Sequence, residues 1–340
     1  MRAARARARL RRVTPLDLRR VPRPADRDRL EVRDLTAAAA HGAELLGDQR
    51  AQLGERPVWD DGAGALVWVD IDGRAVHRWA GGDSARDSVL STTSPVGVAW
   101  PTASGGLLLA TAEGLGVHDG TRLGTVTRPE GMPGDYRFND GGCDPAGRFW
   151  VATQPRDGSA GDGVVHRVVA GPGGLEIDTA VTGVALGNGI VWGPDGSVLY
   201  LTDTDAKVVY RLSYDVATGA AGEPEPFLAF AEDGPGPDGT AVDAEGGLWI
   251  ATYGGGHVLR FAADGTPRGA YAVPVPDVTC PGFGPAGSRR LYVTTASGGG
   301  SGTGGDALPG PTSAEHERGG AVFGFDVDVD GLPVRVFADA

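Results

Sequence analysis

The chain has 340 residues, of which 57 are Gly and 24 are Pro, and its formal net charge is -13. The glycines follow no three-residue period, which excludes collagen, and a hydrophobic content of 41% excludes general disorder. Glycine and proline at this level in an ordered protein indicate many turns between short strands.

The first 34 residues differ in charge from the rest of the chain. They carry a net charge of +7, so the remaining residues carry -20. An acidic body argues against a nucleic-acid-binding protein. The basic head contains Arg11-Arg12 but no apolar stretch follows, and Asp17, Asp26 and Asp28 do not suit a transit peptide. We therefore interpret residues 1–42 as a disordered leader, with a basic interaction tail as the alternative.

Membrane and redox signals are few. No stretch reaches the roughly 18 apolar residues that a membrane span requires. Cys143 and Cys280 lie far apart in the sequence, and neither has the spacing of a metal site or a disulfide framework. This usage predicts two buried thiols in a reducing compartment, and hence a cytoplasmic protein.

One pattern recurs through the body of the chain: an apolar residue, a turn rich in Asp, Pro and Gly, and then an apolar strand. The residue before each turn is the anchor of its repeat. The anchors are Trp59, Trp100, Cys143, Trp192, Val242 and Phe283, which are 41 to 50 residues apart. Units of this length fit four-stranded blades, so residues 43–340 are predicted to form an all-β, six-bladed β-propeller. A pair of β-sandwiches is the alternative, but it does not explain the even spacing.

Weaker strands with alternating polarity follow the hairpins. They are predicted at 75–79, 164–168, 207–214 and 257–261. The segment 43–54 is predicted to supply the outer strand of the last blade, because an open ring would leave exposed strand edges. A Gly/Ser-rich insertion at 297–318 is predicted to be a flexible loop.

Residues at equivalent positions of the repeat converge around the channel of a propeller. The position four residues before each anchor holds Glu55, Val96, Asn139, Asn188, Asp238 and Thr279. Four of these side chains are carboxylates or carboxamides, which strand propensity does not favour. They could instead be turn residues that enter a strand. Two acids with two amide oxygens make an oxygen-only site, which suits Ca²⁺, Mg²⁺ or Mn²⁺ better than Zn²⁺.

The same stretches carry a resemblance to a known family. They read LGERPVWDD (53–61), RFNDGGCDPAGRFWVAT (137–153), LGNGIVWGPDGSVLYLTDT (186–204) and GPDGTAVDAEGGLWIATYGGGHVLRF (236–261). Over residues 43–340 the chain resembles the senescence-marker-protein/gluconolactonase/luciferin-regenerating family, a family of six-bladed propellers with one divalent metal in the channel. The resemblance implies that Glu55, Asn188 and Asp238 bind the metal, with Ca²⁺ favoured. It implies that Arg137 and Asn139 contact the substrate.

The resemblance also implies an activity, the hydrolysis of sugar lactones or small aliphatic lactones. The cation would polarise the lactone carbonyl, and Asp238 could accept a proton from the attacking water. Two departures concern the substrate: Gly142 stands where the family often has Lys, and no acidic contact is evident after 153–158. The alternatives are a non-enzymatic calcium-binding or scaffold propeller and a phosphotriesterase-like hydrolase on the same fold. The sequence gives no signal about the oligomeric state.

Overall fold

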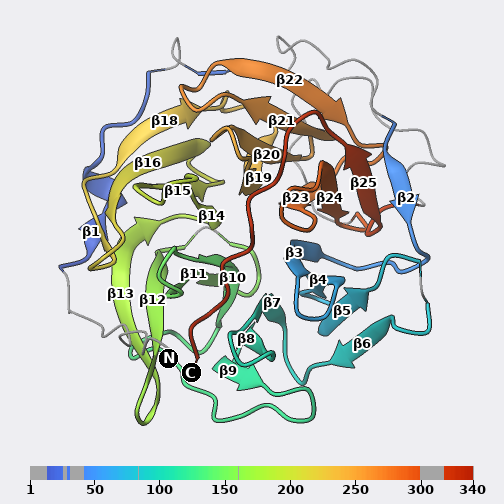
Figure 1. Cartoon of the computed structure of the whole chain (residues 1–340). Coiled ribbons are helices and arrows are strands. Elements are labelled where there is room, and N and C mark those ends of the chain that lie inside the picture. The colour runs from blue at the N-terminus through green and yellow to red at the C-terminus, as the bar shows by residue number, and fades with distance from the viewer. Residues whose placement is uncertain are drawn as a thin grey trace, which may run out of the picture.

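The computed structural model describes residues 14–25, 29–30, 42–82, 84–159, 161–298 and 318–339. Within these residues the chain forms six sheets that are arranged as a ring (Figure 1). The prediction of an all-β, six-bladed propeller is therefore confirmed. The predicted flexible loop at 297–318 lies almost wholly outside the described residues.

The first three blades take up the chain as far as residue 184. The first is β3 (Gly54–Asp60), β4 (Ala65–Asp70), β5 (Ala75–Trp79) and β6 (Ser88–Ser91). The second is β7 (Val96–Pro101), β8 (Leu107–Thr111) and β9 (Gly114–His118). The third is β10 (Tyr136–Cys143), β11 (Phe149–Pro155), β12 (Gly163–Gly171) and β13 (Gly174–Val184).

The remaining three blades follow in chain order. The fourth is β14 (Gly187–Trp192), β15 (Val198–Asp203), β16 (Val208–Asp215), β17 (Ala220–Ala221) and β18 (Glu225–Ala229). The fifth is β19 (Gly236–Val242), β20 (Leu248–Tyr253), β21 (His257–Phe261) and β22 (Pro267–Ala272). The sixth contains β23 (Val278–Phe283), β24 (Arg290–Thr295) and β25 (Val322–Asp326). Each anchor residue lies at or next to the end of the inner strand of its blade.

The ring is closed by a strand from the other end of the chain. The strand β2 (Glu44–Leu46) pairs antiparallel with β25 and completes the sixth sheet. This pairing confirms the prediction that segment 43–54 supplies the outer strand of the last blade. It covers the edge that β25 would otherwise expose.

The second blade departs from the prediction of four strands. Its described sheet has three strands. Among the described residues, the chain that follows pairs with β9 at the isolated bridges Leu115↔Thr127 and His118↔Leu123. This segment contains glycines and prolines, which weaken a ladder or remove its donors, so a regular fourth strand does not form.

Part of the basic leader is ordered, in contrast to the expectation of disorder over 1–42. The strand β1 (Leu16–Asp17) pairs in parallel with β13 on the outer edge of the third blade, and Leu18 in the short 3₁₀ turn Leu18–Arg20 is buried. Further along, Leu30 bridges to Phe230 of the fourth blade. These few apolar residues are enough to attach the segment to a free strand edge. Residues 1–13, 26–28 and 31–41 lie outside the described residues.

The hairpin turns of the repeat are held by aspartate side chains. Asp144 Oδ1 accepts hydrogen bonds from the N–H groups of Ala146 and Arg148, at 2.8 and 2.9 Å. Asp243 makes the same pattern in the fifth blade, with Glu245 and Gly247 as donors. An Asp that bonds its own following backbone stabilises a tight turn. These acids are therefore structural.

Large apolar side chains fill the spaces between adjacent blades. Trp150 of the third blade packs with Trp192 of the fourth, and Phe230 and Phe261 pack between the fourth and the fifth. Both cysteines are buried free thiols, as predicted. In the described part of the chain, no helix is long and apolar enough to cross a membrane. The cytoplasmic location stays a prediction.

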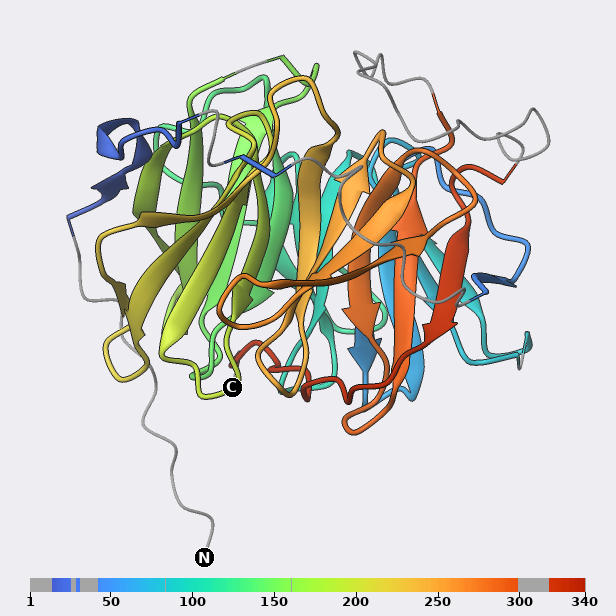
Figure 2. The ribbon, with the colours of Figure 1, turned by 90° about the horizontal axis from the view of Figure 1, so that it is seen from above.

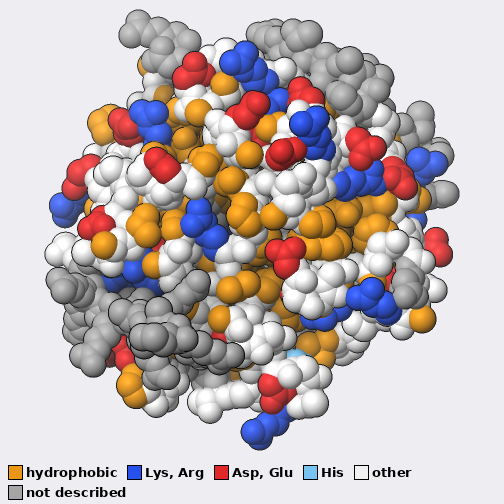
Figure 3. Space-filling model, viewed as in Figure 1, with side chains coloured by type: hydrophobic (Ala, Val, Ile, Leu, Met, Phe, Trp, Pro, Cys, Tyr) orange, Lys and Arg blue, Asp and Glu red, His pale blue; other side chains and the backbone are white. Residues whose placement is uncertain are grey.

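After β25, residues 327–339 form a strap across one face of the ring (Figures 1 and 2). The Ala244 N–H donates to Asp330 O at 2.9 Å, and Trp100 Nε1 donates to Arg335 O at 2.8 Å. These contacts place the strap at the anchor ends of the inner strands. Figure 3 shows hydrophobic side chains across the middle of this face.

A buried histidine on β12 predicts how stability depends on pH. His166 is 5% exposed, and burial lowers its pKa to about 4. The unfolded chain, with an ordinary histidine pKa near 6.5, binds this proton at higher pH than the folded chain does. The stability is therefore complete above about pH 6.5 and falls by up to about 3 kcal/mol as the pH drops to 4. We expect His166→Leu to reduce this fall in urea unfolding at pH 7 and pH 4.5, and equal pH dependence in the two proteins would contradict the assignment.

A candidate active site in the channel

Every inner strand has an irregularity at the same place in the repeat. The register between the first two strands of each blade shifts by one residue near the position four before the anchor. Each shift places one extra residue on the inner strand, as a β-bulge does. Because a bulge bends the strand and changes the direction of its side chains, it lets polar groups turn toward the channel. This explains why residues with low strand propensity occupy these positions.

A chain of hydrogen bonds connects the third and fourth blades at this level. Arg137 Nη1 donates to Asn139 Oδ1 at 2.7 Å. Asn139 Nδ2 donates to Asn188 Oδ1 at 2.8 Å, and Asn188 Nδ2 donates to Thr204 Oγ1 at 2.8 Å. All three long side chains are buried, with 6% or less of each residue exposed. The network fixes the orientation of both amides.

Two buried carboxyl groups complete the predicted set. Glu55 and Asp238 are each 5% exposed. Burial, and then the neighbouring Asp140 carboxylate, raise the pKa of Glu55 to about 8. Burial, and then the charges of Glu55 and Asp140, raise the pKa of Asp238 well above its ordinary value. The two groups therefore lie close enough to oppose each other's ionisation, which a bound cation would relieve.

The structure brings together the residues predicted from the sequence. Glu55 and Asp238 interact electrostatically, and Arg137, Asn139 and Asn188 form one hydrogen-bonded chain. The other two equivalent positions do not extend the site, because Val96 is apolar and the Thr279 hydroxyl donates to Gly54 O at 2.6 Å. The roles of these residues as ligands and substrate contacts stay predictions.

An ion pair next to the site was not predicted. Arg56 Nε lies 3.2 Å from Asp140 Oδ1, and both residues are buried. Both occupy the position three residues before an anchor, where the repeat holds Arg56, Gly97, Asp140, Gly189, Gly239 and Cys280. One Arg and one Asp at a position otherwise filled by glycines and a cysteine is a signal that a comparison of repeats could have found.

Three further polar residues near the site were also missed. Burial and the acids Asp277, Asp238 and Glu55 raise the pKa of the Tyr253 phenol. The exposed Asp72 opposes the effect of burial, which lowers the pKa of Arg137. Gln154 is 4% exposed and pairs with Arg137 in the β10–β11 ladder. Tyr253 and Gln154 lie at the ends of the second strands of their blades and Asp72 follows one, so a search of inner strands does not reach them.

The donor set fits a hard divalent cation. Among the described residues, no group of three or more His, Cys, Asp or Glu side chains is placed to hold a metal ion. The predicted ligands include only two such residues, Glu55 and Asp238, and the third predicted ligand, Asn188, offers an amide oxygen. Carboxylate and amide oxygens are the ligands that Ca²⁺ takes, and the raised pKa values of both carboxyl groups are those of anions without their counter-charge.

Fold and site together define a β-propeller with a polar, carboxylate-containing channel. The family described as SMP-30/gluconolactonase/LRE-like region matches residues 53–297. The chain belongs to this family, as the motifs around the channel indicated.

Known proteins resemble the chain over most of its length. Pentonolactonase XacC of Haloferax volcanii is 36% identical over 292 residues, which are 84% of this chain and 94% of that protein. The 6-deoxy-6-sulfogluconolactonase of Pseudomonas putida is 32% identical and covers 85% of this chain and 96% of its own. The crystal structure of a calcium-binding protein, regucalcin, from Agrobacterium tumefaciens has a TM-score of 0.77 at 26% identity and covers 89% of this chain and 99% of its own.

Proposed function

We propose that the chain is a lactonase that hydrolyses a sugar lactone in the channel, with the help of a divalent cation. The enzyme class follows from membership of the family and from two lactonases among its relatives. The observation that carries the proposal is Arg137, a buried cation beside Asn139. Among the described residues it forms no ion pair, so its charge is available to the oxygens of a ligand.

The residues of the chain divide the work of ester hydrolysis. Arg137 stays protonated at neutral pH and donates to substrate oxygens, and the amide of Asn139 adds a second polar contact. A carboxylate oxygen of Asp238 accepts a proton from the attacking water. The water oxygen bonds to the carbonyl carbon and the ring C–O bond breaks, so the accepted proton can pass to the leaving alkoxide.

Glu55, Asn188 and Asp238 would hold the cation, for which Ca²⁺ is favoured over Mg²⁺, Mn²⁺ and Zn²⁺. When bound, it would polarise the lactone carbonyl and favour the ionisation of water. The cation would also neutralise the two buried carboxylates.

Acid release from a panel of lactones tests the proposal. We expect the purified protein with Ca²⁺ to hydrolyse gluconolactone and a pentonolactone, to lose at least about 90% of the rate with a chelator, and to recover it when a divalent ion is added. Absence of hydrolysis with every lactone and metal would contradict the proposal. Metal binding seen by calorimetry without any hydrolysis would instead support a non-enzymatic calcium-binding propeller. A rate that the chelator does not change would remove the cation from the mechanism.

A further inference from the structure

Gln154 lies next to the C-terminal end of β11, on the face of the third blade that carries the candidate site. It is the direct partner of Arg137 in the antiparallel ladder of β10 and β11. Direct partners in such a ladder project to the same face of the sheet. Trp150 and Ala152, which alternate with Gln154 on β11, pack against the fourth blade. The Gln154 side chain therefore shares with Arg137 and Asn139 the face that looks toward Asn188.

The carboxamide of Gln154 has an unmet hydrogen-bonding requirement. The residue is 4% exposed, and within the part of the chain that the structure describes its Oε1 is buried without a hydrogen-bond partner. Buried polar groups almost always have a partner, because one without it loses the hydrogen bond it made to water. A buried acceptor without a partner beside a substrate site indicates that the ligand supplies the missing hydrogen-bond donor.

Arg137 supplies the complementary group on the neighbouring strand. Within the described residues, both hydrogen bonds that it donates come from Nη1, to Phe138 O at 3.1 Å and to Asn139 Oδ1 at 2.7 Å. The rest of the guanidinium group can donate to a ligand. An acceptor and a donor side by side match a hydroxyl group, which donates one hydrogen and accepts another.

We propose that Gln154 and Arg137 together bind a ring hydroxyl of the substrate, and that Gln154 makes the site prefer polyhydroxylated lactones to unsubstituted ones. The proposal rests on the proposed lactonase function and specifies its substrate class. A site built to bond a hydroxyl rejects the analogue without it, because the polar groups of the site are then left unpaired.

The test compares D-glucono-δ-lactone with δ-valerolactone, which has the same ring without hydroxyls. We expect Gln154→Met, which keeps the length of the side chain, to lower kcat/KM for gluconolactone by about 10- to 100-fold, mainly through KM. The rate with δ-valerolactone should stay within about twofold. The preference for the hydroxylated lactone therefore falls by the same factor as kcat/KM for gluconolactone. Gln154→Ala, which cannot overpack the site, should give the same loss of preference.

Gln49 provides a matched control. Its Oε1 is also buried without a partner among the described residues, but it lies before β3, next to a pocket at Leu46 and Trp79 and away from the channel. Gln49→Met should leave the preference unchanged. The inference is overturned if Gln154→Met lowers both rates equally, if it changes neither, or if the wild-type protein prefers δ-valerolactone. A wild-type protein that hydrolyses neither lactone contradicts the proposed function itself.

Discussion

The Asp238→Asn variant should lose lactone hydrolysis, with kcat lowered about 10³- to 10⁴-fold, while its metal-free form becomes more stable than the wild type. The loss has two causes, because the amide cannot accept a proton from water and the site keeps only one of its two anions. The gain in stability of the metal-free form has a separate cause. Asp238 is 5% exposed, and burial and the nearby Glu55 charge raise its pKa. Removing this charge should stabilise the metal-free protein by about 1–2 kcal/mol.

Two measurements check this result, steady-state hydrolysis with Ca²⁺ and urea unfolding with chelator at pH 8. Asp233→Asn is the control, because Asp233 is an exposed acid on the loop that leads into the same strand β19. It should change neither activity nor stability. An Asp238→Asn protein with more than about a tenth of wild-type activity would contradict the role of Asp238. A less stable metal-free variant would contradict the inference that the charges of Glu55 and Asp238 repel each other.

The fold could be predicted because each blade repeats one local pattern. The strands at 75–79 and 257–261 match β5 and β21 residue for residue, since alternation in a half-buried strand is visible in the sequence. The prediction of a fourth strand in the second blade was wrong, because the repeated pattern does not include the outer segment of a blade. The blades share the inner hairpin, but the outer segment of each blade varies in its glycine and proline content.

The site could be predicted only where the repeat itself carries it. Glu55, Asn139, Asn188 and Asp238 share one repeat position, so counting from the anchors was enough to find them. Gln154 lies on a second strand and has meaning only through its partner Arg137, which depends on the register between two strands. The ordered leader was missed because Leu16 and Leu18 give too little apolar sequence to stand out. Their stabilisation comes from the edge of β13, which the sequence does not show.

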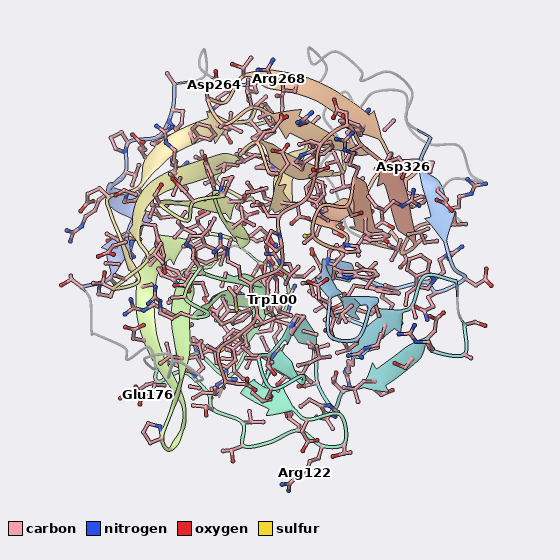
Figure 4. All side chains as sticks on the ribbon, viewed as in Figure 1. Trp100, Arg122, Glu176, Asp264, Arg268 and Asp326 are labelled. Carbon is pink, nitrogen blue, oxygen red and sulfur yellow. The ribbon has the colours of Figure 1, made fainter. Side chains whose placement is uncertain are left out.

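Arg56 connects all the blades at the axis of the propeller. It belongs to the first blade and contacts one residue from each of the other five, namely Trp100, Asp140, Ile190, Thr240 and Cys280. Its guanidinium carbon lies 5.2 Å from the centroid of the Trp100 ring, and Trp100 lies near the middle of the ring of blades in Figure 4. Arg56 has a φ of 45°, a conformation that residues other than glycine rarely adopt. Such a backbone is kept only where the surrounding contacts over-determine it.

The position of Arg56 separates two parts of the channel. On one side, its N–H donates to Glu55 Oε2 at 3.1 Å, which orients a predicted metal ligand. On the other, it lines a cavity of about 120 Å³ that is also lined by Pro333 and Arg335 of the strap. The Asp140 carboxylate that it faces also accepts the Gly189 N–H at 2.6 Å. Arg56 therefore supplies the counter-charge to a third carboxylate, that of Asp140, whose charge also acts on Glu55 and Asp238.

We expect Arg56→Met to lower the free energy of unfolding by about 3–5 kcal/mol, because removing one partner of a buried ion pair leaves the other charge without compensation. Replacing both partners by neutral groups of similar size avoids that cost, so Arg56→Met combined with Asp140→Asn should recover most of the loss. Urea unfolding of the two single variants and the double variant measures the coupling. Arg78→Met is the control, because its ion pair with Asp60 is partly exposed and should cost at most about 1 kcal/mol. A double variant as unstable as Arg56→Met would show that Arg56 stabilises the protein by its packing at the propeller axis. Its charge would then not be needed to compensate that of Asp140.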